Sequence, residues 1–127
     1  MVKKQYVPAR GDIVWLNFNP QSGHGTDTKP RSGAGSPLAQ SGKRPALVLS
    51  PKEYNEKTGL GLFCPITSKV KDYPFEVKID NSQIKGVILS DQIKSMDWRS
   101  RAIEFILKGT TETINEVINK ISVLLYA

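Results

Sequence analysis

The ten residues 42–51 constrain the fold of this chain more than any other stretch. Their sequence, Gly-Lys-Arg-Pro-Ala-Leu-Val-Leu-Ser-Pro, runs from a basic turn into four apolar residues and ends at a Ser-Pro pair. An apolar run this short, bounded by prolines, predicts a buried strand over 46–49, with its leucines on one face and its valine on the other. Arg44 then lies at the mouth of the strand, where its guanidinium can face solvent from a rigid backbone. A guanidinium held in this way is suited to binding a phosphate.

Short apolar runs separated by turn residues predict most of the remaining structure as strands. The expected strands cover residues 13–18, 60–64, 66–68, 75–79, 86–90 and 103–107. Pro65 is expected to end the strand that precedes it. A helical turn is expected from Pro51 onward, with Ser50 as its cap.

The carboxyl end of the chain has a different period. Apolar residues recur there at three- and four-residue steps between Ile114 and Leu125, which predicts one amphipathic helix. Thr113 and Glu116 fit a capping box at its start. Several short strands followed by one terminal helix predict an α+β fold, in which a small curled antiparallel sheet packs on that helix.

Length and charge limit the class of protein further. A chain of 127 residues suits one domain with a real core. There are 18 Lys and Arg residues against 12 Asp and Glu residues, and the net charge of +6 favours a polyanionic partner. One cysteine allows no internal disulfide, and neither a signal peptide nor a long apolar span is visible in the sequence. We therefore expect a soluble, cytoplasmic protein with no membrane association.

The residue types that the sequence lacks narrow the possible chemistry. His24 is the only histidine, which excludes a two-histidine ribonuclease site within one subunit. Together with Cys64 it cannot supply the four ligands of a structural zinc site. The carboxylates form no metal-binding motif, and there is no P-loop or nucleophile elbow, so we expect neither a metal nor another cofactor. Arginine, threonine and amide groups remain, and these can stabilise a phosphorane without a metal.

Seven short motifs occur in a fixed order along the chain. They are Gly-Asp-Ile-Val-Trp at 11–15, Asn-Pro at 19–20, the Gly-Lys-Arg-Pro strand at 42–50, Pro-Ile-Thr at 65–67, Tyr-Pro-Phe-Glu-Val at 73–77, Asp-Gln-Ile-Lys-Ser at 91–95 and Trp-Arg-Ser-Arg-Ala at 98–102. As a set they resemble the MazF/PemK family of toxin endoribonucleases. The resemblance covers nearly the whole chain except residues 25–39.

This resemblance implies an SH3-like small antiparallel β-barrel with a C-terminal helix, working as a homodimer. It implies metal-independent cleavage of single-stranded mRNA at short recognition sequences. In such enzymes the ribose 2′-hydroxyl attacks the neighbouring phosphate, leaving a 2′,3′-cyclic phosphate and a 5′-hydroxyl. It also implies a cognate MazE-like antitoxin that covers the site. Trp15, Trp98 and the apolar terminal helix are expected to leave apolar surface that a dimer would bury.

The catalytic arginine and threonine of the family fall on Arg44 and Thr67. The resemblance implies that Arg44 neutralises the phosphorane and that Thr67 donates a hydrogen bond to a phosphoryl oxygen. Asp91 and Gln92 match an acidic-Gln pair that lines the RNA groove in relatives, and unpaired RNA exposes base edges that such groups can read. The full set of expected RNA-binding residues is Asn19, His24, Gln40, Lys43, Ser68, Lys69, Asp91 and Gln92.

Two departures from the family pattern concern the site. Relatives run from a Gly-His or Gly-Ser pair through Glu-Gln and a glycine into the Arg-Pro strand, whereas residues 25–39 stand here in place of the glutamate. We expect a single domain over residues 1–127 with this insertion as a surface loop. PemK-like relatives also place an arginine where this chain has Leu89, so no catalytic role is assigned to that position.

Two other functions are compatible with the sequence. A gyrase-poisoning toxin shares the barrel and needs no nuclease residues, but that family ends in Trp-Gly-Ile, whereas this chain ends in Leu-Leu-Tyr-Ala. The second is a catalytically impaired RNA-binding homologue, inactivated by the insertion. A gel assay on unstructured RNA with a chelator present, followed by end-group analysis, distinguishes the three functions.

Overall fold

The computed structural model describes residues 5–19 and 42–126. The expected insertion at 25–39 and two expected RNA-binding residues, His24 and Gln40, lie outside these ranges. Within the described ranges, no helix has the length and apolar character needed to cross a membrane.

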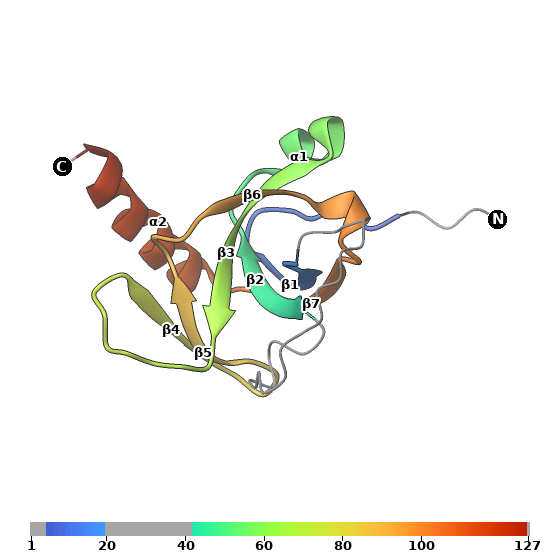
Figure 1. Ribbon diagram of the computed structural model, residues 1–127. Helices are drawn as coiled ribbons and strands as arrows, with labels where there is room; N and C mark the ends of the chain where they lie inside the picture. The colour runs from blue at the N-terminus through green and yellow to red at the C-terminus, as the bar shows by residue number, and fades with distance from the viewer. Residues whose placement is uncertain (1–4, 20–41, 127) are drawn as a thin grey trace.

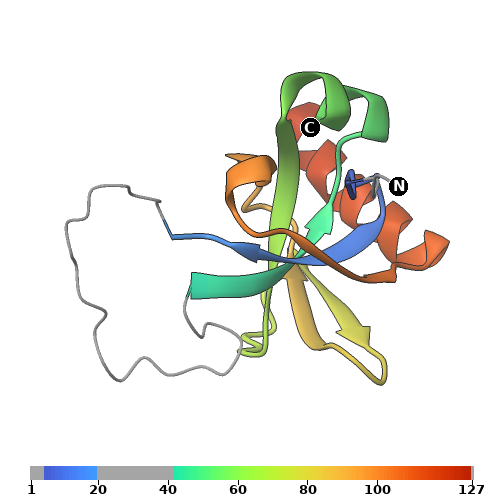
Figure 2. The ribbon, with the colours of Figure 1, turned by 90° about the vertical axis from the view of Figure 1, so that its right-hand side faces the viewer.

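Strands dominate the described part of the chain. The elements are β1 (Asp12–Asn17), β2 (Lys43–Val48), α1 (Lys52–Thr58), β3 (Leu60–Thr67), β4 (Glu76–Asp80), β5 (Lys85–Leu89), β6 (Lys94–Asp97), the 3-10 turn η2 (Trp98–Ser100), β7 (Glu104–Lys108) and α2 (Thr111–Tyr126). The strands pair antiparallel in the order β4-β5-β3-β2-β1-β7, and β6 pairs with β3 outside this path. Figures 1 and 2 show the sheet curling into a half-barrel with α2 along one side. The expected α+β class, a small antiparallel barrel with a C-terminal helix, is confirmed.

The central strand β2 contributes to a different apolar cluster on each of its faces. Leu47, together with Leu49 just after the strand, belongs to one cluster, which also contains Val117 of α2. Val48 belongs to the other cluster, which also contains Trp98. The predicted alternation along this strand is therefore confirmed. Trp98 is buried in the core, so the expectation that it leaves apolar surface for a dimer is wrong.

The strand β3 continues through Pro65, contrary to the prediction that this proline ends it. One edge of β3 pairs with β6 from Leu60 to Phe63 and with β5 at Ile66 and Thr67. Successive residues of a strand direct their N–H and C=O groups to opposite edges. At Pro65 the backbone nitrogen faces the edge that pairs with β6 and β5, at the point between these two strands. The missing N–H is tolerated because the ladder on that edge is interrupted at this point.

The helix α2 begins earlier than the predicted capping box. The Thr110 hydroxyl accepts a hydrogen bond from the Thr113 N–H at 3.1 Å, which is the bond of an N-cap residue to the third helical residue. Thr113 therefore lies inside the first turn, and its prediction as the cap is wrong. The apolar stripe itself is confirmed, since Ile114 and Ile121 pack against the core.

Asn55, in α1, is a buried polar centre of the fold. Its side-chain amide donates to the carbonyls of Pro8 (2.8 Å) and Ser50 (3.1 Å), and its side-chain oxygen accepts from the Ser50 hydroxyl (2.6 Å). Its backbone carbonyl accepts from the Trp98 indole N–H at 3.2 Å. These bonds join the N-terminal segment, α1 and η2. They also occupy the Ser50 hydroxyl, so the prediction that Ser50 caps α1 is wrong, and α1 begins at Lys52 without a side-chain cap.

Replacing Asn55 by alanine is expected to lower the free energy of unfolding by about 3 kcal/mol, because several buried groups lose their partners together. In denaturant unfolding the midpoint should fall while the slope stays unchanged. Asn119→Ala, at an exposed position of α2, is the matched control and should change the free energy of unfolding by less than about 0.5 kcal/mol. A loss below about 1 kcal/mol for Asn55→Ala would show that this network does not hold the segments together.

Candidate active site

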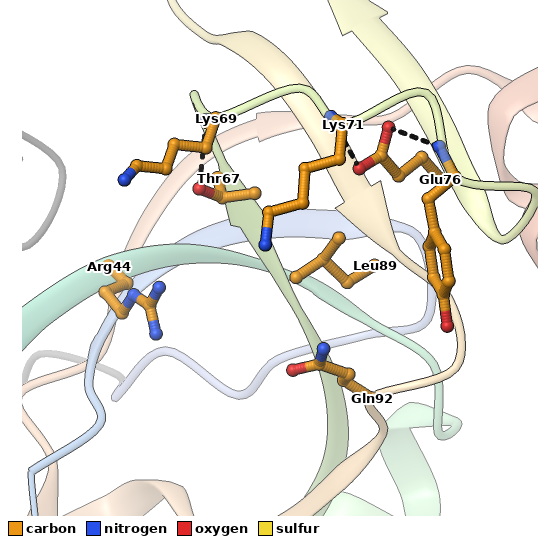
Figure 3. A pocket seen from close by; sticks show the side chains of 8 residues that line it. Arg44, Thr67, Lys69, Lys71, Glu76, Leu89 and Gln92 are labelled. Carbon is orange, nitrogen blue, oxygen red and sulfur yellow. Dashed lines mark hydrogen bonds between the residues drawn. The ribbon is translucent and has the colours of Figure 1, made fainter.

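The register between neighbouring strands brings Arg44 and Thr67 together. β2 pairs with β3 through Ala46 opposite Pro65, and continuing this register by two residues places Arg44 opposite Thr67. Side chains alternate between the two faces of a sheet, so Arg44 and Thr67 lie on the same face as Ala46 and Pro65. Figure 3 shows both side chains at one pocket, presented by adjacent strands.

Arg44 and Thr67 line an open pocket with a volume of about 240 Å³. Its other lining residues are Lys69, Lys71, Tyr73, Glu76, Leu89 and Gln92. Three cationic side chains thus share the lining with one carboxylate, and the pocket is electropositive. Hydroxyl and amide groups add neutral hydrogen-bond donors. A lining of this kind binds anionic groups such as phosphate esters.

Close backbone packing fixes Thr67 at the end of β3. The neighbouring strand β5 pairs with it through Val87, and a Cβ added to Gly86 (φ +152°) would lie 2.2 Å from the Thr67 carbonyl oxygen. Glycine is therefore required for β5 to approach this closely. The Thr67 hydroxyl oxygen accepts a hydrogen bond from the Lys69 N–H at 3.1 Å. The hydroxyl can still donate its own proton to a bound ligand, because a hydroxyl donates and accepts at the same time.

Two carboxylates hold the segment between β3 and β4, which forms one wall of the pocket. Glu76 accepts hydrogen bonds from the N–H groups of Lys71 (3.1 Å) and Tyr73 (3.3 Å), as Figure 3 shows for this loop. The Tyr73 hydroxyl donates to the Asp91 carboxylate. This bond raises the pKa of Tyr73, and desolvation and the charges of Asp91 and Glu76 raise it further. Both carboxylates are thus engaged with the segment that carries the two pocket lysines.

The predicted site residues divide into those that line the pocket and those that lie outside its lining. Arg44, Thr67, Lys69 and Gln92 line the pocket together. The other predicted residues in the described ranges lie outside the lining, namely Asn19, Lys43, Ser68 and Asp91.

Two of these outlying residues have partners of their own. The Lys43 ammonium pairs with Glu104 at 3.5 Å. Asp91 bonds to Tyr73 through one carboxylate oxygen, and its other oxygen is buried without a partner among the described residues. Asp91 therefore lies beside the pocket, where its bond to Tyr73 fixes the segment between β3 and β4.

Lys71, Tyr73 and Glu76 are the pocket residues that the sequence did not single out. Tyr73 and Glu76 belong to the Tyr-Pro-Phe-Glu-Val motif, which supported the family resemblance but gave these residues no role in the site. Glu76 reaches the pocket because it pairs with Leu89 across β4 and β5. That pairing depends on strand register, and the motif itself does not reveal it.

The chain matches known proteins along nearly its whole length. It matches the family model described as "PemK-like, MazF-like toxin of type II toxin-antitoxin system" over residues 9–125. It is 41% identical over 123 residues to the "Endoribonuclease toxin MazF" of Escherichia coli (strain K12), an alignment that covers 95% of this chain and 96% of that protein. The chain therefore belongs to the PemK-like, MazF-like family of toxins.

Two solved structures from Deinococcus radiodurans are similar to it in fold and sequence. MazF (Form-I) has a TM-score of 0.77 and 44% identity, and the match covers 97% of this chain and 100% of that one. The MazE-MazF structure (Form-II) has a TM-score of 0.76 and 40% identity, with 96% and 98% coverage.

The hydrogen bond between Tyr73 and Asp91 predicts that the Tyr73 phenol has a raised pKa. Tyr73 should lose its proton above the ordinary tyrosine pKa of about 10, because the carboxylate accepts the phenolic proton and repels the phenolate. The stabilisation from this contact is complete below the ordinary pKa and is lost as the pH rises through the raised one. NMR titration of the labelled Tyr73 ring measures the pKa, and Asp91→Asn should move it back toward the ordinary value. A titration that Asp91→Asn leaves unchanged would contradict the contact.

Proposed function

We propose that the protein is an endoribonuclease toxin that cleaves single-stranded mRNA without a metal cofactor. The observation that carries this proposal is the presence of Arg44 and Thr67 in one electropositive pocket. The similar E. coli protein is named an endoribonuclease toxin, which supports the same activity here. Exposed Gln92 and Tyr73 at the pocket can contact the bases of an unpaired strand by hydrogen bonding and stacking.

The reaction that suits these groups is an internal transesterification of RNA. The ribose 2′-oxygen forms a bond to the adjacent phosphorus while the bond between phosphorus and the 5′-oxygen breaks. The 2′-hydroxyl gives up a proton and the leaving 5′-oxygen takes one up, so no water is consumed. The products carry a 2′,3′-cyclic phosphate and a 5′-hydroxyl. Negative charge builds up on the phosphoryl oxygens in the transition state, and this charge is what the pocket has to stabilise.

Arg44 and Thr67 have separate roles in this scheme. The Arg44 guanidinium binds two phosphoryl oxygens through its fork of N–H groups, and it stays protonated, so its role is electrostatic. The Thr67 hydroxyl donates to a phosphoryl oxygen while its position is fixed by the Lys69 N–H. Lys69 and Lys71 add positive charge for the neighbouring phosphates of the strand.

Purified protein should cleave unstructured single-stranded RNA equally well with and without EDTA, because this chemistry uses only protein groups and the 2′-hydroxyl. The products should carry 5′-hydroxyl ends, which polynucleotide kinase labels without prior phosphatase treatment. Complete dependence on Mg²⁺, or 5′-phosphate ends, would overturn the mechanism. Binding of RNA without any cleavage would instead identify a catalytically impaired homologue.

Removing either catalytic side chain should slow cleavage without unfolding the protein. Arg44→Ala should lower the single-turnover rate at least about 100-fold, and Thr67→Val about 10- to 100-fold, because each loses a contact to developing charge. Arg99→Ala is the matched control, since its guanidinium lies over the Trp98 ring and outside the pocket lining. If Arg44→Ala cleaves at the parental rate, Arg44 is not catalytic. If Arg44→Ala loses its cooperative thermal unfolding, Arg44 is required for the fold.

A MazE-like antitoxin and a second copy of this chain are the proposed partners, acting in the cytoplasm where mRNA is available. The similar Deinococcus radiodurans protein was solved as a MazE-MazF structure, and an acidic antitoxin segment would complement the pocket's charge. Val123 and Leu125 of α2 are exposed, and a homodimer could bury such surface. Sedimentation as a monomer at micromolar concentration would contradict the dimer, and cleavage unaffected by an acidic antitoxin segment would contradict the antitoxin.

A further inference from the structure

The side chain of Arg44 lies over an aromatic ring. Its guanidinium carbon is 5.5 Å from the centroid of the Phe18 ring. The register explains this contact, because Leu16 pairs with Arg44 across β1 and β2, and Phe18 follows two residues later on the same face. Phe18 is thus the diagonal neighbour of Arg44, a position within reach of long side chains.

An aromatic partner suits an arginine that must bind phosphate. A carboxylate partner would occupy the N–H donors of Arg44 and neutralise its charge. A ring under the guanidinium face attracts the cation through its quadrupole, while the in-plane N–H groups stay directed outward. Within the described residues, no carboxylate lies at salt-bridge distance from Arg44. The Phe18 ring can therefore hold the guanidinium without occupying its N–H donors.

The backbone around Phe18 is fixed on both sides. Its N–H donates to the Gly42 carbonyl at 2.9 Å. The carbonyls of Asn17 and Asn19, which flank it, both accept from Nη1 of Arg101, at 3.0 and 3.2 Å. The Asn17 N–H donates back to the Arg101 carbonyl at 3.0 Å. These bonds fix the backbone position from which the Phe18 ring projects toward Arg44.

The Phe18 side chain also packs against the core. It is half-buried and packs against the cluster that contains Val48 and Trp98. The Phe18 ring therefore contacts both the core and Arg44, which lines the pocket.

We propose that Phe18 is a positioning residue for Arg44, which it orients for the phosphate of the substrate. This inference rests on the proposed function, in which Arg44 stabilises the transition state. Phe18 itself acts through Arg44 and makes no contact with the reacting phosphate. Its effect should therefore appear in the rate of cleavage and depend on the presence of Arg44.

The test is a double-mutant cycle between Phe18 and Arg44, read as single-turnover cleavage of unstructured RNA. Phe18→Leu should lower the rate constant about fivefold, because leucine keeps the apolar contact but lacks the ring. Binding of an uncleavable RNA with 2′-deoxyribose at the cleavage site should stay within about twofold of the parent. In the Arg44→Ala background, Phe18→Leu should have no further effect. Phe105→Leu, at a half-exposed phenylalanine of β7, is the matched control and should keep the parental rate.

Each other outcome overturns the inference. An equal loss in both backgrounds would mean that Phe18 acts on the fold or on RNA directly. A loss of RNA affinity with an unchanged rate would indicate base stacking. If Arg44→Ala cleaves at the parental rate, the proposed site itself fails, and this result is distinct because it appears without any change at Phe18.

A second variant covers the case in which Phe18→Leu unfolds the protein. Pentafluorophenylalanine at position 18 keeps the shape of the ring and reverses its charge distribution. It should lower the cleavage rate at least as much as leucine while the melting temperature stays at the parental value. An unchanged rate with the fluorinated ring would show that the ring does not orient the guanidinium.

Discussion

The pairing of β2 between β1 and β3 is the constraint on which both the core and the pocket depend. A shift by one residue in either register would exchange the two faces of β2. Leu47 would then leave the cluster beneath α2, and Arg44 would leave the side that it shares with Thr67 and Phe18. The apolar packing of Ala46 through Leu49 therefore fixes the position of the arginine. Stability of the sheet and placement of Arg44 at the pocket are consequences of the same hydrogen-bond ladder.

Several acidic side chains near the site stabilise the protein framework. Glu76 accepts two backbone N–H groups, and Asp91 accepts the hydroxyl of Tyr73. Glu104 pairs with Lys43, which lies outside the pocket lining. Positive charge is thus concentrated in the pocket, where the Phe18 ring beside Arg44 adds no negative charge. This arrangement suits a site whose substrate supplies the negative charge.

The sequence predicted the elements whose side chains follow a simple period. The alternation around Leu47 and the helical stripe around Val117 are both confirmed, because burial on one face enforces them. The strand β6 was missed, since its sequence, Lys-Ser-Met-Asp, buries only Met96 and shows no alternation of apolar residues. Pro65 was misread because the missing N–H is tolerated where β3 changes partners, and no local pattern shows that change.

The site was partly predictable for the same reason. Arg44 and Thr67 occur in recognisable motifs, and the register then brings them together. Glu76, Tyr73 and Lys71 reach the pocket through the pairing of β4 with β5 and through a loop held by hydrogen bonds. Contacts of this kind join residues from separate segments, and neither composition nor local spacing determines them.

The bond between Phe18 and Gly42 has a consequence for the evolution of chain length. Figure 2 shows the end of β1 beside the beginning of β2, and this bond of 2.9 Å closes the pair there. The ladder is complete before the connecting residues begin, so the pairing of β1 with β2 sets no requirement on their number, and the loop-closure entropy depends on that number only weakly. Doubling the length of such a connection costs only about 0.6 kcal/mol. Insertions and deletions can therefore accumulate at this junction with little thermodynamic penalty, and it is a natural position for grafting a peptide or for opening new termini by circular permutation.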